Sequence, residues 1–383
     1  MATDISPADR LELATETPNF EGAAQQKFVL SKDEIQPMRR PTKEESTPKR
    51  GLMSIATHQS EPETTDNALP PISHIALNRM GFGPTTGDVE RFNALGENDE
   101  ERLENYVDQQ LSPESLDDLA TELRLIGSGF TTLNKSRDQL WQDHIASRPS
   151  SSVRWLPFRE TERAVFIRAI YSTRQLNEVL ADFWHNHFNI YANDYWAAPM
   201  WVHYDRDIIR GNMLGNFRKM LEDVGTSLAM LYYLDNYTNT AAGPNENYAR
   251  ELFELHGLGA ENYLGVQRQH EVPKDEEGIP IGYVDDDVYE ATRCFTGWTI
   301  NFDNGKVMFD SGNHDRFQKH VLGRFLGADQ PPFKDGRDVY DFVASHPGTA
   351  RHIARKLCRR LIADQPPQSV VDHAASVFRE NLV

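Results

Sequence analysis

Two polar motifs stand within apolar stretches of the sequence and hold residue types that bind metals or transfer protons. The segment "DFWHNHF" (182–188) places His185 and His187 on either side of one asparagine. Side chains two residues apart point the same way in an extended segment but about 200° apart in a helix. The two imidazoles can therefore share an ion only if the helix ends near Trp184. If the helix continues through Phe188, His187 faces the core and His185 points away.

The second motif is "PNENYARELFELHGLG" (244–259), which has the apolar spacing of a helix. On this helix Asn247, Glu251 and Glu254 form one polar stripe beside the apolar face. Two carboxylates three residues apart can bind one cation or share a proton. His256 falls off this stripe if the helix stays regular, and a frayed last turn would bring it back.

Both motifs also have a structural explanation. His187 can be a core residue that hydrogen-bonds a backbone carbonyl, with His185 on the surface. Arg250 can pair with Glu246 and Glu254, which would make an ordinary charged helix face. The order of Glu254 and His256 matches neither the Glu-x-x-His of di-iron bundles nor the His-Glu-x-x-His of zinc proteases.

These alternatives leave three hypotheses for function. The first is a metal-dependent hydrolase with one divalent ion (zinc, manganese or iron), because imidazole and carboxylate without thiolate suit these metals. The second is a non-enzymatic helical scaffold or binding module in which the polar motifs form a buried network. The third is a metal-free acid–base enzyme. The predicted site residues are His185, His187 and His256 as metal ligands, Glu251 and Glu254 as catalytic groups, and Asn236, Asn247 and Arg250 as substrate-binding groups.

Composition narrows the class of protein. The formal net charge is −18, which disfavours nucleic acid as a partner because phosphate binding needs a basic surface. No run of about 18 apolar residues predicts a membrane span. The chain has only two cysteines, which exclude a disulfide framework. No signal peptide is visible at the N-terminus, so the default expectation is a cytoplasmic protein, with a protein partner left open.

The elements that must position these motifs are helical. Residues 1–70 are rich in Glu, Thr, Pro, Lys and Ser, and we expect a disordered or loosely packed arm. From residue 71 to 383 helical patterns follow one another. An example is "SLDDLATELRLIG" (115–127), which places Leu116, Leu119, Leu123 and Ile126 at helical spacing before Gly127. Two β-prone runs around an Asn-Gly pair predict one small hairpin near 298–309. The predicted fold is therefore all-α with that hairpin, in a single helical domain over 71–383.

The order of several long motifs resembles the domain-of-unknown-function family numbered 1800, a group of bacterial proteins. These motifs are "MGFGPTTGDV", "FWHNHFNI", "LGNFRKMLEDV", "AMLYYLDN", "PNENYARELFELHGLG", "ATRCFTGW", "HDRFQKHVLG" and "RKLCRRLIADQPP". The resemblance covers the chain from about Ile72 and implies no particular activity. It directs attention to the His-Asn-His motif at 185–187 and to the Asn-Glu-Asn-Tyr-Ala-Arg-Glu motif at 245–251, which continues to Glu254 and His256.

The chain also departs from what the resemblance implies. Similar proteins join the second motif to the next helix by a short turn, whereas here a charged insertion (267–281) intervenes and would cover the site. Similar proteins are often exported with a signal sequence. They also continue with further helices where this chain stops, so we expect the domain to be truncated at its C-terminus.

Overall fold

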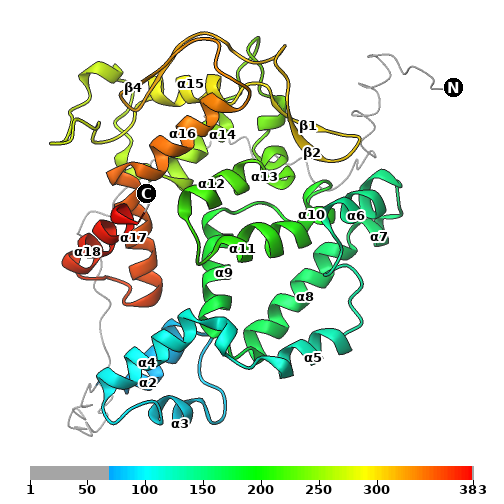
Figure 1. Ribbon diagram of the computed structural model, residues 1–383, viewed down its shortest axis with the longest axis vertical. Helices are drawn as coiled ribbons and strands as arrows, with labels where there is room; N and C mark the ends of the chain where they lie inside the picture. The colour runs from blue at the N-terminus through cyan, green and yellow to red at the C-terminus, as the bar shows by residue number, and fades with distance from the viewer. Residues whose placement is uncertain (1–68, 382–383) are drawn as a thin grey trace, which may run out of the picture. The chain divides into compact units, whose positions relative to one another are not determined.

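Helices account for most of the computed structural model, which describes residues 69–381 (Figure 1). The predicted arm over 1–70 lies almost entirely outside the described residues. The helices of the first half are α2 (Ile72–Arg79), α3 (Asp88–Asn93), α4 (Asp99–Leu111), α5 (Leu119–Gly127), α6 (Arg137–Trp141), α7 (Ser151–Arg154), α8 (Leu156–Tyr171) and α9 (Gln175–His187). Those of the second half are α10 (Ala197–His203), α11 (Arg210–Asn212), α12 (Phe217–Gly225), α13 (Leu228–Tyr233), α14 (Asn247–Glu251), α15 (Asp285–Cys294), α16 (Lys334–Ser345), α17 (Pro347–Leu361) and α18 (Gln368–Glu380).

Three π-helical segments extend α-helices within residues 69–381. They are η2 (Gln142–Ala146) after α6, η3 (Tyr204–Ile209) between α10 and α11, and η5 (Leu252–His256) after α14. A π-helix pairs residues five apart along the backbone, so each segment changes which side chains share a face. None of the described helices is long and apolar enough to cross a membrane.

The predicted all-α fold with a small hairpin is confirmed. Strands β1 (Trp298–Asn301) and β2 (Lys306–Phe309) pair antiparallel, with Asn301 opposite Lys306 at the turn. Gly305 has φ +66°, and a Cβ at this position would lie 2.1 Å from the ring of Trp141. Both the backbone conformation and the lack of space for a side chain therefore require glycine at this position. A second hairpin, β3 (Lys319–Val321) with β4 (Arg324–Leu326), was not predicted.

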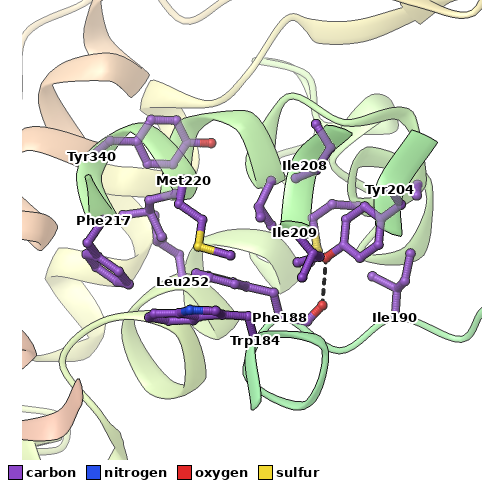
Figure 2. Packing of buried hydrophobic residues seen from close by; sticks show 14 of the residues in the cluster. Trp184, Phe188, Ile190, Tyr204, Ile208, Ile209, Phe217, Met220, Leu252 and Tyr340 are labelled. Atoms are coloured by element: carbon purple, nitrogen blue, oxygen red, sulfur yellow. Dashed lines mark hydrogen bonds between the residues drawn. The ribbon is translucent and has the colours of Figure 1, made fainter. Parts of the chain in front are cut away.

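The core that supports the polar motifs is aromatic. Figure 2 shows Trp184 and Phe188 lying near Phe217 and Leu252, which come from α12 and η5. The ring centroids of Trp184 and Phe188 are 5.8 Å apart, and those of Trp184 and Phe217 are 5.9 Å apart. The hydroxyl of Tyr204 donates to the carbonyl oxygen of Phe188 at 2.7 Å (Figure 2). This contact fixes the backbone at the point where α9 has ended.

Helix α9 runs to His187 and does not end near Trp184. Leu176, Leu180 and Trp184 share its buried face, and the amide of Phe188 still donates to the carbonyl of Trp184 at 2.8 Å. The apolar period thus carries the helix through the whole His-Asn-His motif. Since His185 and His187 lie within one α-helix, they point in different directions.

Candidate functional site

A cavity of about 270 Å³ opens where the C-terminal end of α9 meets η5 and α17. Its wall combines three imidazoles, an amine and a carboxylate with neutral side chains. The lining residues are Asn186, His187, Asn189, Tyr233, Leu234, Glu251, Leu255, His256, His352 and Lys356. The cavity therefore brings Asn186 and His187 of the first motif together with the polar groups Glu251 and His256 of the second.

The π-helical turn η5 explains how His256 joins Glu251 in this wall. Five residues apart in a regular α-helix, these two side chains would point about 140° apart. In a π-helix residues five apart lie on nearly the same side. The π-helical turn, and not a frayed last turn, therefore places His256 on the same side as Glu251. Glu254, in the middle of η5, does not line the cavity.

His187 is buried and uses both ring nitrogens. Its Nε2 lies 3.0 Å from the carbonyl oxygen of His256, and its Nδ1 lies 2.7 Å from Nζ of Lys356. A carbonyl oxygen only accepts, so the neutral ring carries its proton on Nε2, and Nδ1 accepts from Lys356. Burial and then the charge of Lys356 hold the pKa of His187 well below its usual value. His187 thus has the backbone partner of the structural explanation and is also part of the cavity wall.

Helix α17 supplies His352 and Lys356, which are four residues apart and so share one helix face. Nδ1 of His352 lies 3.0 Å from Oε1 of Glu261. A carboxylate accepts, so Nδ1 carries the proton and Nε2 of a neutral ring has its lone pair free. This Nε2 is buried and has no hydrogen-bond partner among the described residues. Arg355 also approaches Glu261, at 3.4 Å.

Gly259 makes the pairing of His352 with Glu261 sterically feasible. It has φ +91°, a region that side chains rarely tolerate. A Cβ at this position would lie 2.4 Å from Nδ1 of His352 and 2.5 Å from Oε2 of Glu261. Although burial raises the pKa of the Glu261 carboxyl, the hydrogen bond from His352 lowers it, and the net shift is downward. The carboxylate is therefore ionised where it holds the imidazole.

Burial shifts three other groups of the wall toward their neutral forms. It lowers the pKa of His256 to about 3, with a smaller contribution from the charge of Lys356. It lowers the pKa of the Lys356 amine, against the opposing charge of Glu261. It raises the pKa of Glu251, with help from the negative charge of Glu254. Perturbed acids and bases that converge on one cavity are typical of active sites.

His185 belongs to a different environment. Its Nε2 lies 2.9 Å from Oδ1 of the buried Asp205, and Nε of Arg210 lies 3.1 Å from both oxygens of the same carboxylate. Arg210 also donates to both oxygens of Glu178, at 2.9 and 2.8 Å. Burial raises the pKa of Asp205, but the opposing effects of Arg210 and then His185 are larger together, and the pKa falls to about 2. We call His185, Asp205, Arg210 and Glu178 the ion-pair network.

The substrate-binding residues predicted from sequence lie outside the cavity wall. Asn236 is fully buried, and its Oδ1 accepts from Nδ2 of Asn239 at 3.2 Å. Asn247 is exposed, with only a 3.4 Å contact from Nδ2 to the carbonyl of Leu234. Arg250 pairs with Glu246 at 3.1 Å and with Asp285 at 3.4 Å. The expected pairing of Arg250 with Glu254 is replaced by the pair with Asp285.

The predicted metal ligands do not form a set. His185 faces Asp205, while the rings of His187 and His256 have their centroids 6.2 Å apart. Both nitrogens of His187 are already engaged. Over residues 69–381, no group of three or more His, Cys, Asp or Glu side chains is arranged to hold a metal ion. The condition set for a shared ion, a helix end near Trp184, is not met.

Sequence reasoning missed Glu261, His352 and Lys356. The spacing His-x-x-x-Lys in "ARHIARKL" places two titratable side chains on one face of a helix, a pattern that could have been noticed. Nothing in the sequence indicated that this face would meet His187. The insertion 267–281 was expected to cover the site, but none of its residues lines the cavity. It contacts α17 and α18 instead, through Pro280 with His346 and Glu277 with Arg379.

The structure thus defines a helical protein with a small polar cavity rich in imidazole. The family model described as "protein of unknown function (DUF1800)" matches residues 75–382, and the chain belongs to this family. No curated protein and no solved structure matches it.

Proposed function

We propose that the cavity is the active site of a metal-independent enzyme that binds a small polar molecule and transfers protons to and from it. The observation that carries this proposal is the pairing of Glu261 with His352, which leaves a free Nε2 lone pair on a ring of the cavity wall. A carboxylate that holds an imidazole in this tautomer is the arrangement of a general base.

The roles follow from the charge states of the wall. His352 accepts a proton from a bound water or substrate group, and Glu261 stabilises the imidazolium that forms. Burial raises the pKa of Glu251, so a larger fraction of this carboxyl carries a proton and is available as a general acid. His256 stays neutral and offers a hydrogen bond without a charge. A hydrolysis in which His352 activates water is the simplest reaction of this type.

This proposal keeps Glu251 as a catalytic group and replaces the metal-dependent form of the hydrolase. The residues present do not fit an ion, because the predicted ligands His185 and His187 face different surroundings. A buried nitrogen without a hydrogen-bond partner costs about 1–3 kcal/mol, a cost that a ligand or water at Nε2 of His352 would remove.

The test measures hydrolysis of small p-nitrophenyl esters by the full chain, before and after treatment with a chelator. Replacing the general base by His352→Gln should lower the rate by about 100-fold or more. The matched control is Arg351→Gln, which changes the exposed neighbour on the same helix. In parallel, crystals are soaked with small polar fragments. The proposal is wrong if His352→Gln leaves the rate unchanged, or if neither hydrolysis nor a fragment in the cavity is observed.

The second candidate function is the non-enzymatic scaffold. It is favoured by the ion-pair network, in which Arg210 of α11 joins Glu178 of α9 to Asp205 of η3 without reaching the cavity. Such a network fixes how helices sit against one another. If the scaffold is the whole function, His352→Gln should alter neither ligand binding nor catalysis.

A further inference from the structure

Lys356 differs from Lys319, the one fully buried lysine of the described chain. Lys319 pairs with the buried carboxylate of Asp335. Lys356 is partly buried in the cavity wall, yet no carboxylate among residues 69–381 lies within ion-pair distance of its Nζ. A partly desolvated ammonium without a counter-ion is unfavourable, and the neutral amine avoids this cost.

The surroundings of Nζ suit a neutral amine. Its hydrogen bond goes to Nδ1 of His187, 2.7 Å away, and that nitrogen accepts because Nε2 donates to the carbonyl of His256. An amine that donates one N–H to His187 keeps its lone pair for the cavity. Burial lowers the pKa of Lys356 in the direction that this chemistry requires. Desolvated lysines of this kind act as nucleophiles toward carbonyl carbon.

We propose that Lys356 forms an imine with a small aldehyde or ketone that enters the cavity. This inference rests on the proposed function, because it takes the cavity as the active site. The volume of about 270 Å³ lies just below the usual range for ligand pockets, roughly 300–1,000 Å³, so the carbonyl compound is small.

The step balances with groups present in the wall. The lone pair of Nζ forms a bond to the carbonyl carbon while the C=O electron pair moves to oxygen. The two protons of the amine end on that oxygen, which leaves as water when the C=N bond forms. His352 lies one helical turn from Lys356, and its free Nε2 can carry these protons. No oxidant, reductant or metal is needed.

The competing use of Lys356 is as a cation that binds an anion such as phosphate. Glu251 lines the same cavity, and in its ionised form its negative charge repels an anion. The opposing effect of Glu251 is absent for an uncharged carbonyl compound. We therefore favour the imine, and the experiment includes phosphate as the alternative.

The test traps the imine by reduction. The full chain is incubated near pH 7 with propionaldehyde or acetone and sodium cyanoborohydride, and alkylated lysines are located by peptide mass spectrometry. Lys356 should be labelled at least several-fold faster than the exposed Lys219, because burial lowers its pKa and so leaves more of the amine unprotonated. Lys356→Arg should abolish this label, and Lys219→Arg should leave it unchanged. Lys356→Met is a second variant if the arginine disturbs folding.

The outcomes separate this inference from the proposal on which it rests. If fragments bind in the cavity but Lys356 is labelled no faster than Lys219, the imine is rejected and the acid–base site stands. If Lys356 is labelled but His352→Gln leaves ester hydrolysis unchanged, the acid–base proposal fails and the reactive amine stands. If Lys356 is labelled no faster than Lys219 and inorganic phosphate slows this labelling further, an anion site would replace the imine.

Discussion

The two histidines of one motif lie in two regions with opposite electrostatics. His185 joins the ion-pair network, where charges are buried but matched, as Arg210 donates to Asp205 and Glu178. His187 joins the cavity wall, where burial drives Lys356 and His256 toward their neutral forms. The charged groups of the network pair with one another and so contribute to structure, although Nδ1 of His185 has no hydrogen-bond partner among the described residues. In the cavity wall, Nε2 of His352 has no hydrogen-bond partner among the described residues and is available to accept a proton from a ligand.

The largest expected effect is on the network. Arg210→Met removes the cation shared by Asp205 and Glu178 and leaves two carboxylates buried without it. We expect a loss of about 3–5 kcal/mol in the free energy of unfolding, measured by urea denaturation. Arg210→Lys keeps the charge but cannot bind both carboxylates with a planar fork, so a partial loss is expected. Equal stability of wild type and Arg210→Met would show that the network is not structural.

The second prediction concerns the cavity and acid. His256 has a folded-state pKa of about 3, below its ordinary value of 6.5. The unfolded chain therefore binds a proton on His256 at a higher pH than the folded chain does. This contribution to stability is complete above pH 6.5 and is lost as the pH falls toward 3, by a few kcal/mol in all. Urea denaturation over this range should show a weaker pH dependence for His256→Gln.

The matched control for His256 is His373→Gln, a change at an exposed histidine of α18. It should leave the acid dependence as in wild type. The backbone carbonyl that accepts from His187 is kept in His256→Gln, so that hydrogen bond survives the change. Identical pH profiles for wild type and His256→Gln would contradict the buried neutral imidazole.

The third prediction is that acid destabilises the ion-pair network at a lower pH than it destabilises the cavity. Asp205 has its pKa lowered from 3.8 to about 2, so its contribution is present above pH 3.8 and is lost as the pH falls toward 2. The amount is about 2–3 kcal/mol, at roughly 1.4 kcal/mol for each pKa unit. Asp205→Asn should remove this step while leaving the step due to His256 in place. A single change that abolished both steps would mean that the two regions titrate together.

The smallest expected effect lies outside both regions. Arg250 pairs with Glu246 and Asp285 at the surface, although the sequence suggested a substrate-binding role. Exposed ion pairs contribute about 1 kcal/mol or less, so Arg250→Ala should change stability by no more than this. It should leave fragment binding and the labelling of Lys356 unchanged. A large loss of fragment binding would return Arg250 to the site.

Local patterns predicted where helices form better than they predicted which helix faces are buried. The spacing of Leu116, Leu119, Leu123 and Ile126 predicted a helix over 115–127. The structure has helix α5 only over Leu119–Gly127, and its Leu119, Leu123 and Ile126 are 57–75% exposed. Helical spacing shows that apolar side chains share a face but does not show which neighbour covers it. The same limit explains why the meeting of Lys356 with His187, 169 residues earlier, was not foreseen.

The sequence by itself determined that the chain is helical with a hairpin at 298–309, because apolar periodicity and an Asn-Gly turn are local properties. It also identified His187, Glu251 and His256 as polar groups set in apolar helices. Only the tertiary structure separated His185 from His187, because α9 continues to His187 and turns one ring toward Asp205 and the other toward Lys356. The π-helical turn that returns His256 to Glu251 and the approach of α17 likewise depend on packing between distant segments, which no local pattern encodes.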